Sequence, residues 1–313
     1  MPIDLRKITR GREKRPIKVA IYSSPALGKT TFACSAPNAF VLDTDKGSHP
    51  YDVAQRVVPE SWAEAKEWLE AVEKGSIKCD SLVVDSLTQF EAMAMQELFG
   101  LEGIASFGGG WGKGDKTLMA HWRVVMAQIE RIWRGGKNVI LTCHVKVKSY
   151  TDPMLANPYD RFQIALQEDV AGMVNQWSDY VLFLREDVVL QNGQSGNARA
   201  VSPGTRSIYT KRTPAYDAKA RGISGFPERL PLSWDAFERA ILDEESRTKA
   251  MVTEIDSALL EISDEKMTRA VREWLKTHPT SLVDTHNRVI SRLREKREAT
   301  AQTATSETQE EKI

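Results

Sequence analysis

A short apolar segment that runs directly into a Gly-Lys-Thr loop constrains the fold of this chain more than any other feature. Residues 17–22 read Ile-Lys-Val-Ala-Ile-Tyr, and residues 23–31 read Ser-Ser-Pro-Ala-Leu-Gly-Lys-Thr-Thr. A strand, a tight loop and a helix N-terminus in this order direct backbone N–H groups and the positive end of the helix dipole toward an anion. The segment therefore predicts a phosphate-binding loop at the carboxyl end of a buried strand.

The residues of this loop match the chemistry of a bound nucleoside triphosphate. We expect the Lys29 ammonium on the β- and γ-phosphates of ATP and the Thr30 hydroxyl on Mg²⁺. The predicted nucleotide contacts are Ser24, Pro25, Ala26, Leu27, Gly28, Lys29, Thr30 and Thr31. Ser23 replaces the first glycine of the pattern G-x-x-x-x-G-K-[ST], so a plain strand-to-helix turn is the alternative interpretation. We expect Ser23 and Ala26 in ordinary backbone conformations or under mild strain.

A second strand that ends in an acid supports the phosphate-binding interpretation. Residues 79–86 read Cys-Asp-Ser-Leu-Val-Val-Asp-Ser, which is the Walker B form, and Asp85 is the predicted second Mg²⁺ residue beside Thr30. The alternative is a simple helix cap made by Asp85 or Ser86. The 55 residues between Lys29 and Asp85 leave room for the strand and helix that a crossover between parallel strands requires.

Two other apolar runs deliver polar residues to the same predicted edge of the sheet. Residues 39–42 lead into Asp43 and Asp45, and one of these acids can orient or deprotonate the attacking water. For Asp43 we favour the role of a turn residue before Gly47. Residues 138–143 lead into His144, which either senses the γ-phosphate or is structural.

Together these segments resemble the RecA-type recombination ATPase core. More closely, they resemble the phage-encoded, RecA-like single-strand annealing proteins of the Sak group, over roughly residues 15 to 240. The resemblance rests on residues 42–45, residues 83–86, the strand that ends at His144, and the run Lys219-Ala220-Arg221. It implies that Asp45 occupies the position of the glutamate that places the attacking water, with a side chain one methylene shorter, which argues against fast hydrolysis.

The same resemblance implies two further roles. His144 stands where RecA-like proteins carry a glutamine or histidine that links the γ-phosphate to the DNA loops. Lys219 and Arg221 stand where they carry a pair of cations that reach the nucleotide of a neighbouring subunit, which would require an oligomer. The alternative for Lys219 and Arg221 is a solvated surface loop.

Two segments combine aromatic residues with cations and are candidates for contact with DNA. Residues 106–116 are too rich in glycine to hold structure by themselves, and residues 145–168 carry two tyrosines and two lysines. Aromatic faces stack on bases, and lysine and arginine follow the phosphates. The predicted DNA-binding residues are Trp111, Lys113, Lys116, Lys146, Lys148, Tyr150 and Arg161. Long loops of this kind are either functional or disordered.

The predicted fold class is α/β. Strands alternate with helical patterns up to about residue 185 and then give way to period-two segments, which indicates a RecA-like P-loop NTPase core with a mostly parallel sheet extended by antiparallel strands. A small C-terminal helical appendage follows, with Ser263 expected to cap one of its helices. The predicted boundaries are a basic arm at 1–16, the ATPase core at 17–245, the helical appendage at 246–298 and a disordered tail at 299–313.

Composition narrows the classes of function. The 43 basic and 43 acidic residues cancel, so contact with DNA must come from local patches rather than from net charge. Cys34, Cys79 and Cys143 lie far apart and predict reduced core thiols rather than disulfides or a zinc site. No apolar run approaches about 20 residues, so we expect no membrane insertion and no secretion. The resemblance further implies the cytoplasm of a phage-infected bacterial host, which is the location that we expect.

The motifs predict an ATP-binding protein, and the resemblance implies that it binds single-stranded DNA and assists annealing or strand pairing in phage recombination. ATP and Mg²⁺ are the expected cofactors, with hydrolysis that is slow and stimulated by DNA. The expected partners are single-stranded DNA, further copies of the chain in a ring or filament, and, as an additional candidate, a single-strand binding protein. The alternatives are a nucleotide-gated DNA-binding module with negligible turnover, and a helicase or helicase-loader ATPase.

Overall fold

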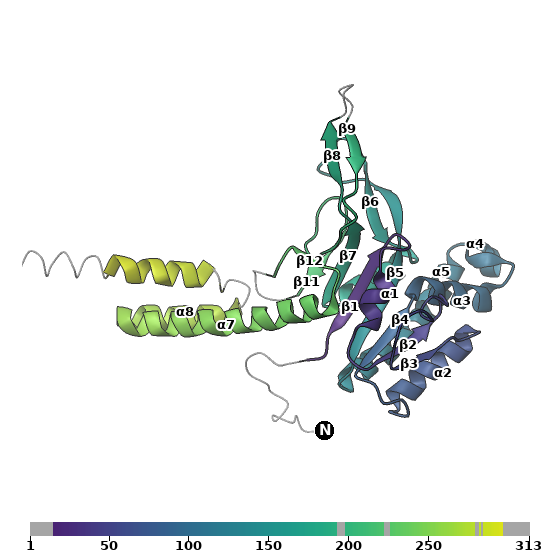
Figure 1. Ribbon diagram of the computed structural model, residues 1–313, viewed down its shortest axis with the longest axis horizontal. Coiled ribbons are helices and arrows are strands. Elements are labelled where there is room, and N and C mark those ends of the chain that lie inside the picture. Colours follow the sequence, from purple (N-terminus) through teal and green to yellow (C-terminus); the bar gives the residue numbers. More distant parts are fainter. Residues whose placement is uncertain (1–14, 193–197, 222–225, 279–281, 283, 297–313) are drawn as a thin grey trace, which may run out of the picture. The chain divides into compact units, whose positions relative to one another are not determined.

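The computed structural model describes residues 15–192, 198–221, 226–278, 282 and 284–296 (Figure 1). The described residues group into two compact units. The first runs to Lys219 and includes Pro231–Trp234, and the second contains the remainder of the chain. The division into arm, core, appendage and tail that we expected from the sequence stays a prediction, and most of the arm and all of the tail lie outside the described residues.

A mostly parallel sheet forms the centre of the first unit, with the order β10-β7-β1-β5-β4-β2-β3. The parallel strands are β1 (Lys18–Ser23), β2 (Ala39–Asp43), β3 (Gln55–Val57), β4 (Ser81–Asp85), β5 (Asn138–Tyr150) and β7 (Tyr180–Glu186). Antiparallel strands extend it: β10 (Arg206–Tyr209) pairs with β7, and β6 (Tyr159–Ile164) pairs with β5. The predicted α/β fold class is confirmed.

The remaining strands are short. A separate two-stranded sheet consists of β8 (Val189–Asn192) and β9 (Ala198–Val201). The strands β11 (Lys219–Ala220) and β12 (Arg229–Pro231) lie where the chain passes between the two units.

Helices connect the strands of the first unit. They are α1 (Lys29–Cys34), α2 (Trp62–Glu73), α3 (Leu87–Phe99), α4 (Gly103–Ser106), α5 (Lys113–Arg134) and α6 (Glu168–Trp177). Ser61 caps α2, because its side chain accepts the N–H of Glu64 at 3.1 Å. The apolar residues of α2, α3 and α5 recur at helical spacing, so each helix buries one stripe.

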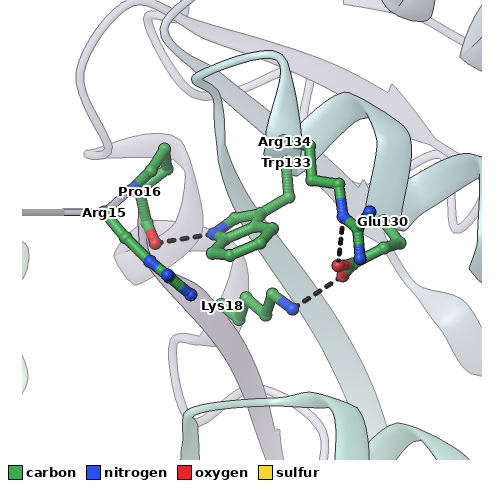
Figure 2. Close-up of a pocket in the computed structure, with 6 residues that line it drawn as sticks. All are labelled: Arg15, Pro16, Lys18, Glu130, Trp133 and Arg134. Atoms are coloured by element: carbon green, nitrogen blue, oxygen red, sulfur yellow. Dashed lines mark hydrogen bonds and ion pairs between the residues drawn. The ribbon is translucent and has the colours of Figure 1, made fainter. Parts of the chain in front are cut away.

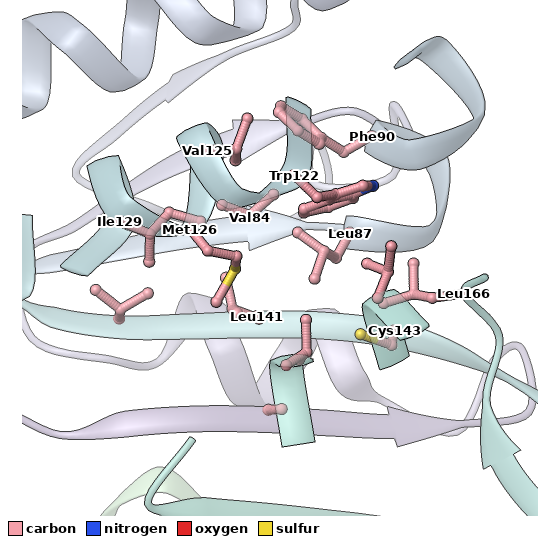
Figure 3. Close-up of a cluster of buried hydrophobic side chains, with 14 of the residues drawn as sticks. Val84, Leu87, Phe90, Trp122, Val125, Met126, Ile129, Leu141, Cys143 and Leu166 are labelled. Carbon is pink, nitrogen blue, oxygen red and sulfur yellow. The ribbon is translucent and has the colours of Figure 1, made fainter. Parts of the chain in front are cut away.

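The main core lies between one face of the sheet and helices α2, α3, α5 and α6. Phe90 of α3 and Trp122 of α5 pack over Val84 and Leu141 of the central strands, and all four side chains are at most 2% exposed (Figure 3). Trp122 is thus a core residue. The alternate strand positions are buried as well, for example Ile21 and Val83 at 0% exposure. Strands buried on both faces are typical of a parallel sheet that has cover on each side.

The two segments predicted as loops carry more structure than we expected. Strand β5 does not end at Cys143 but continues to Tyr150 and forms a hairpin with β6, in a register from Val145↔Ile164 to Tyr150↔Tyr159. The alternation Val-Lys-Val-Lys explains this, because it suits a strand with one face packed and one exposed. Residues 103–113 form the short helix α4, a 3₁₀ turn at Phe107–Gly109 and the start of α5.

The second unit is helical and has its own small core. It contains most of α7 (Trp234–Ile262) and α8 (Glu265–Thr277), and its buried apolar cluster includes Ile255, Leu259, Leu282 and Val289. The expected cap at Ser263 is wrong by one residue. Ser263 takes up a left-handed conformation at φ 57°, and the Asp264 side chain accepts the N–H of Met267 at 2.9 Å. Within the described ranges, every helix is too short or too polar to span a bilayer.

Candidate functional site

The loop between β1 and α1 has the shape that its glycine dictates. Gly28 is the N-cap of α1 with φ 105°, a left-handed conformation that glycine adopts without strain. A Cβ at this position would also lie 2.7 Å from Cδ2 of Leu232, so the Leu232 side chain would have to shift for any other residue. Ala26 also has a positive φ, of 62°, which costs an alanine about 1 kcal/mol. This is the mild strain expected where glycine is absent.

Lys29 is held inside this loop. Its ammonium donates hydrogen bonds to the Ser23 carbonyl at 3.2 Å, to the Ser23 hydroxyl at 3.1 Å and to the Ser24 carbonyl at 3.1 Å, and the residue is only 7% exposed. Burial lowers the pKa of Lys29 from its ordinary value, and the nearby carboxylates of Asp85 and Asp45 oppose that shift. The loop therefore contains a positive charge with little water around it.

Asp85 joins the loop to the neighbouring strands. Its carboxylate accepts the Thr30 hydroxyl at 2.8 Å and also the Thr142 hydroxyl, and the residue is 2% exposed. Burial raises the pKa of Asp85 above its ordinary value, and the hydrogen bonds from Thr142 and Thr30 oppose the shift. Helix α3 is capped by Ser86 and not by Asp85, because the Ser86 hydroxyl accepts the N–H of Gln89 at 3.2 Å.

A hydroxyl and a carboxylate in contact fit the requirements of Mg²⁺. This ion prefers oxygen ligands and is usually held by one or two protein groups together with phosphates and water, rather than by a cage of side chains. Thr30 and Asp85 supply such a pair. The part of the chain that the structure describes has no group of three or more His, Cys, Asp or Glu residues suited to a metal.

Asp45 and His144 form a second pair at the same edge of the sheet. His144 Nε2 lies 2.9 Å from Asp45 Oδ2, and the backbone N–H groups of Thr44 and Asp45 donate to the Asp85 carbonyl at 2.8 and 3.1 Å. Burial alone would raise the pKa of Asp45, but hydrogen bonds from His144 and Ser86 and the nearby charges bring it below its ordinary value. The carboxylate is therefore ionised, and His144 must donate from Nε2.

The register of the strands explains why these residues meet. Ser23 lies opposite His144 across the β1–β5 pair, and Asp43 lies opposite Asp85 across the β2–β4 pair. Because all four strands are parallel, their carboxyl ends share one edge. Asp43 itself serves the turn, as we expected, since its carboxylate accepts the N–H groups of Gly47 and Ser48 at 3.1 and 2.8 Å.

The boundary between the two units falls between the two predicted trans-acting cations. Lys219 belongs to the first unit, where its ammonium donates to the Asn175 carbonyl at 2.5 Å. Arg221 is exposed and belongs to the second unit. Their contact with a neighbouring subunit stays a prediction.

The predicted DNA-binding residues differ in their surroundings. Trp111 is 95% exposed and Lys116 is exposed, while Lys113 donates to the Gly108 carbonyl at 2.7 Å and so stabilises the turn before α5. Lys148 forms an exposed ion pair with Glu168, at 2.6 Å. Lys146, half-buried, donates to the Leu166 carbonyl.

Arg161 lies in a different environment from the exposed lysines. It is 3% exposed, forms an ion pair with Asp217 at 2.7 Å, and its guanidinium stands 4.9 Å from the centre of the Tyr150 ring. Arg161 of β6 thus contacts Tyr150 of β5 and stabilises the hairpin that these strands form.

Sequence reasoning missed Thr142 and Arg206. Thr142 is a polar residue within the apolar run 138–143, and that local contrast could have identified it as a partner of an acid on the next strand. Arg206 donates from Nη1 to the Leu27 carbonyl at 3.4 Å, across 179 positions of sequence. Its proximity to the loop depends on the pairing of β10 with β7, for which the sequence offers no comparable signal.

A pocket of about 470 Å³ lies at the opposite edge of the sheet, where β1 begins, and Figure 2 shows its lining. The Glu130 carboxylate accepts Lys18 at 2.6 Å and Arg134 at 2.9 Å, and the Trp133 indole donates to the Pro16 carbonyl at 2.6 Å. The Lys18 ammonium also stands 3.8 Å from the centre of the Trp133 ring. These contacts join the start of β1 to the end of α5, so we assign them to stability.

Comparison with known proteins agrees with the geometry of the loop and its acids. The family model described as AAA domain matches residues 15–222, which is more than half of the 313 residues. The search of the curated proteins returned no match. The match spans β1, the loop with Lys29, the strand that ends at Asp85, His144 and Arg206, and on this evidence the chain belongs to the AAA domain family.

Proposed function

We propose that this protein binds ATP with Mg²⁺ and, in that state, binds single-stranded DNA and assists annealing or strand pairing in phage recombination. The observation that carries the nucleotide part is the contact of 2.8 Å between the Thr30 hydroxyl and the Asp85 carboxylate, next to the Lys29 ammonium. The AAA domain match supports nucleotide binding. The DNA part rests on the resemblance and on the surroundings of the candidate residues.

Each residue of the site would have a separate task. Lys29 binds the β- and γ-phosphates, and Thr30 and Asp85 hold Mg²⁺, which supplies positive charge to the phosphate oxygens when bound. Asp45 is ionised and orients the attacking water, although its hydrogen bond to His144 occupies one of its oxygens. A movement of the Asp45 carboxylate on nucleotide binding would therefore change its hydrogen bond to His144.

His144 connects this site to a candidate DNA segment. It precedes Val145, where the pairing of β5 with β6 begins, so a shift of its ring or backbone acts on the base of the hairpin. Its backbone N–H also donates to the Thr88 hydroxyl of α3 at 3.0 Å. This continuous path supports the proposed report of nucleotide state from His144 to the hairpin.

The two candidate DNA segments are joined by Gln167, which precedes α6. Its side-chain amide donates to Asp115 at 3.3 Å in the first turn of α5, and its backbone N–H donates to Glu91 at 2.9 Å. The turn with Trp111 and the hairpin with Lys146, Lys148 and Tyr150 are thereby tied to α3. Aromatic faces and lysines on joined elements suit binding to a strand without sequence preference.

Self-association completes the proposal. A ring or filament would bring Lys219 and Arg221 of one subunit to the nucleotide of the next, where added positive charge stabilises phosphoryl transfer. A single-strand binding protein remains a further candidate partner.

Replacement of Trp111 tests the DNA part of this proposal. Trp111→Ala should weaken binding of a labelled oligothymidylate in the presence of ATP by about 1–3 kcal/mol, as expected for one stacked base, and should slow annealing of complementary strands. Trp274→Ala is the matched control, because Trp274 is a half-exposed tryptophan of the second unit, stacked on His278. If the two variants lose the same DNA affinity, or if Trp111→Ala loses none, then Trp111 does not contact DNA.

The pairing of Asp45 with His144 favours one second candidate, a nucleotide-gated DNA-binding module. A short carboxylate already bonded to His144 is poorly placed to activate water, so ATP could serve chiefly to fix the conformation that binds DNA. Phosphate release measured with and without single-stranded DNA separates the two functions. DNA-stimulated release supports the ATPase, and nucleotide-dependent DNA binding without release supports the module.

A further inference from the structure

Arg206 lies beside the phosphate-binding loop and has no role in the function proposed above. We propose that Arg206 is a second phosphate-binding cation of the nucleotide site, which acts in the same subunit as Lys29. The ligand class is a nucleoside polyphosphate, recognised through its phosphate chain. This inference rests on the proposed nucleotide binding and adds a residue to that site.

The topology of the sheet brings Arg206 to the correct edge. Strand β7 is parallel to β1, so it ends at the edge where the loop begins, and β10 runs antiparallel to β7. Arg206 is the first residue of β10 and pairs with Glu186, the last residue of β7. An arginine at the start of an antiparallel strand thus stands where the parallel strands present their carboxyl ends, which is where α/β sheets bind ligands.

The backbone around Arg206 is fixed from both sides. Asp187 is 8% exposed, and its carboxylate accepts the hydroxyls of Thr205 at 2.6 Å and Ser207 at 3.1 Å. Its backbone N–H donates to the Thr205 carbonyl at 2.9 Å. The two neighbours of Arg206 are therefore anchored to one buried acid, and this positions the arginine with little freedom in its main chain.

The guanidinium itself is exposed and close to the loop. Nη1 stands 3.4 Å from the Leu27 carbonyl and 3.6 Å from the position that a Cβ on Gly28 would take. Across the described ranges, Arg206 forms no ion pair with a carboxylate, in contrast to Arg131, Arg134 and Arg161. Four of its five N–H donors thus remain for other acceptors, and a planar fork of donors suits phosphate oxygens.

The phosphate-binding loop supplies one cation to the phosphate chain, the ammonium of Lys29, and this residue is buried. Arg206 lies on the β7–β10 pair, so its guanidinium would contact phosphate oxygens that Lys29 does not reach. The predicted trans-acting residues Lys219 and Arg221 act only in an assembly, whereas Arg206 would act in an isolated subunit. Removal of Arg206 should therefore weaken binding even in the absence of DNA and of self-association.

Calorimetric titration of the dilute, full-length chain with magnesium and ATP, ADP or AMP tests this. Arg206→Ala should raise the Kd for ATP by about tenfold to a hundredfold, with a smaller effect on ADP and the smallest on AMP. Arg206→Lys should recover part of the loss, because it restores the charge without the fork. Arg134→Ala removes an exposed arginine at the opposite edge of the sheet and should bind ATP like the wild type.

The outcomes separate this inference from the function on which it rests. Nucleotide binding by Arg206→Ala that equals the wild type, or a loss that is the same for ATP and AMP, overturns the inference alone. Absence of nucleotide binding by the wild type overturns both. If Arg206→Ala does not fold by circular dichroism, Arg206→Gln keeps the stem of the side chain without its charge, and undiminished ATP affinity in that variant counts equally against the role of Arg206.

Discussion

At the scale of single residues, Glu91 is a buried acid whose ionisation should affect stability. It lies on α3, is 4% exposed, and one of its oxygens accepts the N–H of Gln167 at 2.9 Å. Burial raises the pKa of Glu91 to about 7, and the bond from Gln167 and the charge of Lys146 oppose the shift. The folded protein therefore holds a proton on Glu91 at pH values where the unfolded chain has released it.

The sign of the effect follows from linkage. Because the folded pKa lies above the unfolded value of 4.5, the free energy of unfolding falls as pH rises from about 4.5 to about 7. Glu91→Gln keeps an acceptor for Gln167 and removes this loss. Chemical denaturation should show that the free energy of unfolding of the variant, relative to that of the wild type, rises by roughly 2–3 kcal/mol from pH 5 to pH 8. A stability difference that is the same at both pH values would contradict the assignment.

Sequence reasoning succeeded for residues whose position is local and failed for those that depend on register. Lys29 and Thr30 are fixed by the loop they belong to, and Asp85 and His144 follow directly from the strands that carry them, so all four could be placed at one edge of the sheet. From the sequence alone, Arg161 and Arg206 would both be expected to be exposed to solvent. Only strand pairing buries Arg161 against Asp217 and brings Arg206 to Leu27.

At the scale of elements, the contact between α4 and α5 depends on Gly114. A Cβ at this position would lie 2.0 Å from the Ile104 carbonyl oxygen, which is backbone and cannot give way cheaply. Gly114→Ala should therefore separate the two helices and destabilise the protein by about 1–3 kcal/mol, with a change in the fluorescence of Trp111 nearby. Chemical denaturation measures the first effect and emission spectra the second.

Gly172 on α6 provides the matched control. Nothing lies within 4 Å of a Cβ built there, so Gly172→Ala should stabilise the helix by about 0.5–1 kcal/mol. Destabilisation of similar size in both variants would mean that the close approach of Ile104 is not the cause.

The elements of the sheet were easier to predict than the segments between them. Apolar runs ending in polar residues identify β1, β2, β4 and β5 because parallel strands are buried on both faces. The sequence predicts a loop where β5 and β6 form a hairpin, because the glycine-free tip and the mixed charges conceal the alternation of Val145 and Val147. The turn at Phe107–Gly109 depends on glycines at positive φ, a conformation that the sequence allows but does not require.

At the scale of the whole molecule, the proposal requires that subunits meet. ATP and single-stranded DNA together should convert the chain into a larger assembly on a sizing column. Lys219→Ala should leave nucleotide binding by isolated subunits intact and should reduce DNA-stimulated phosphate release. A chain that stays monomeric with both ligands, or a variant with normal stimulation, would contradict the role of Lys219 in trans.

The central claim is that a triphosphate and its metal are bound between the loop at Lys29 and the acid at Asp85. Isothermal titration of the wild type and of folded Lys29→Ala with ATP and magnesium tests it most directly. We predict binding of one nucleotide per wild-type chain and no measurable heat of binding for Lys29→Ala. Absence of binding by the wild type, or equal binding by both proteins, would contradict the account.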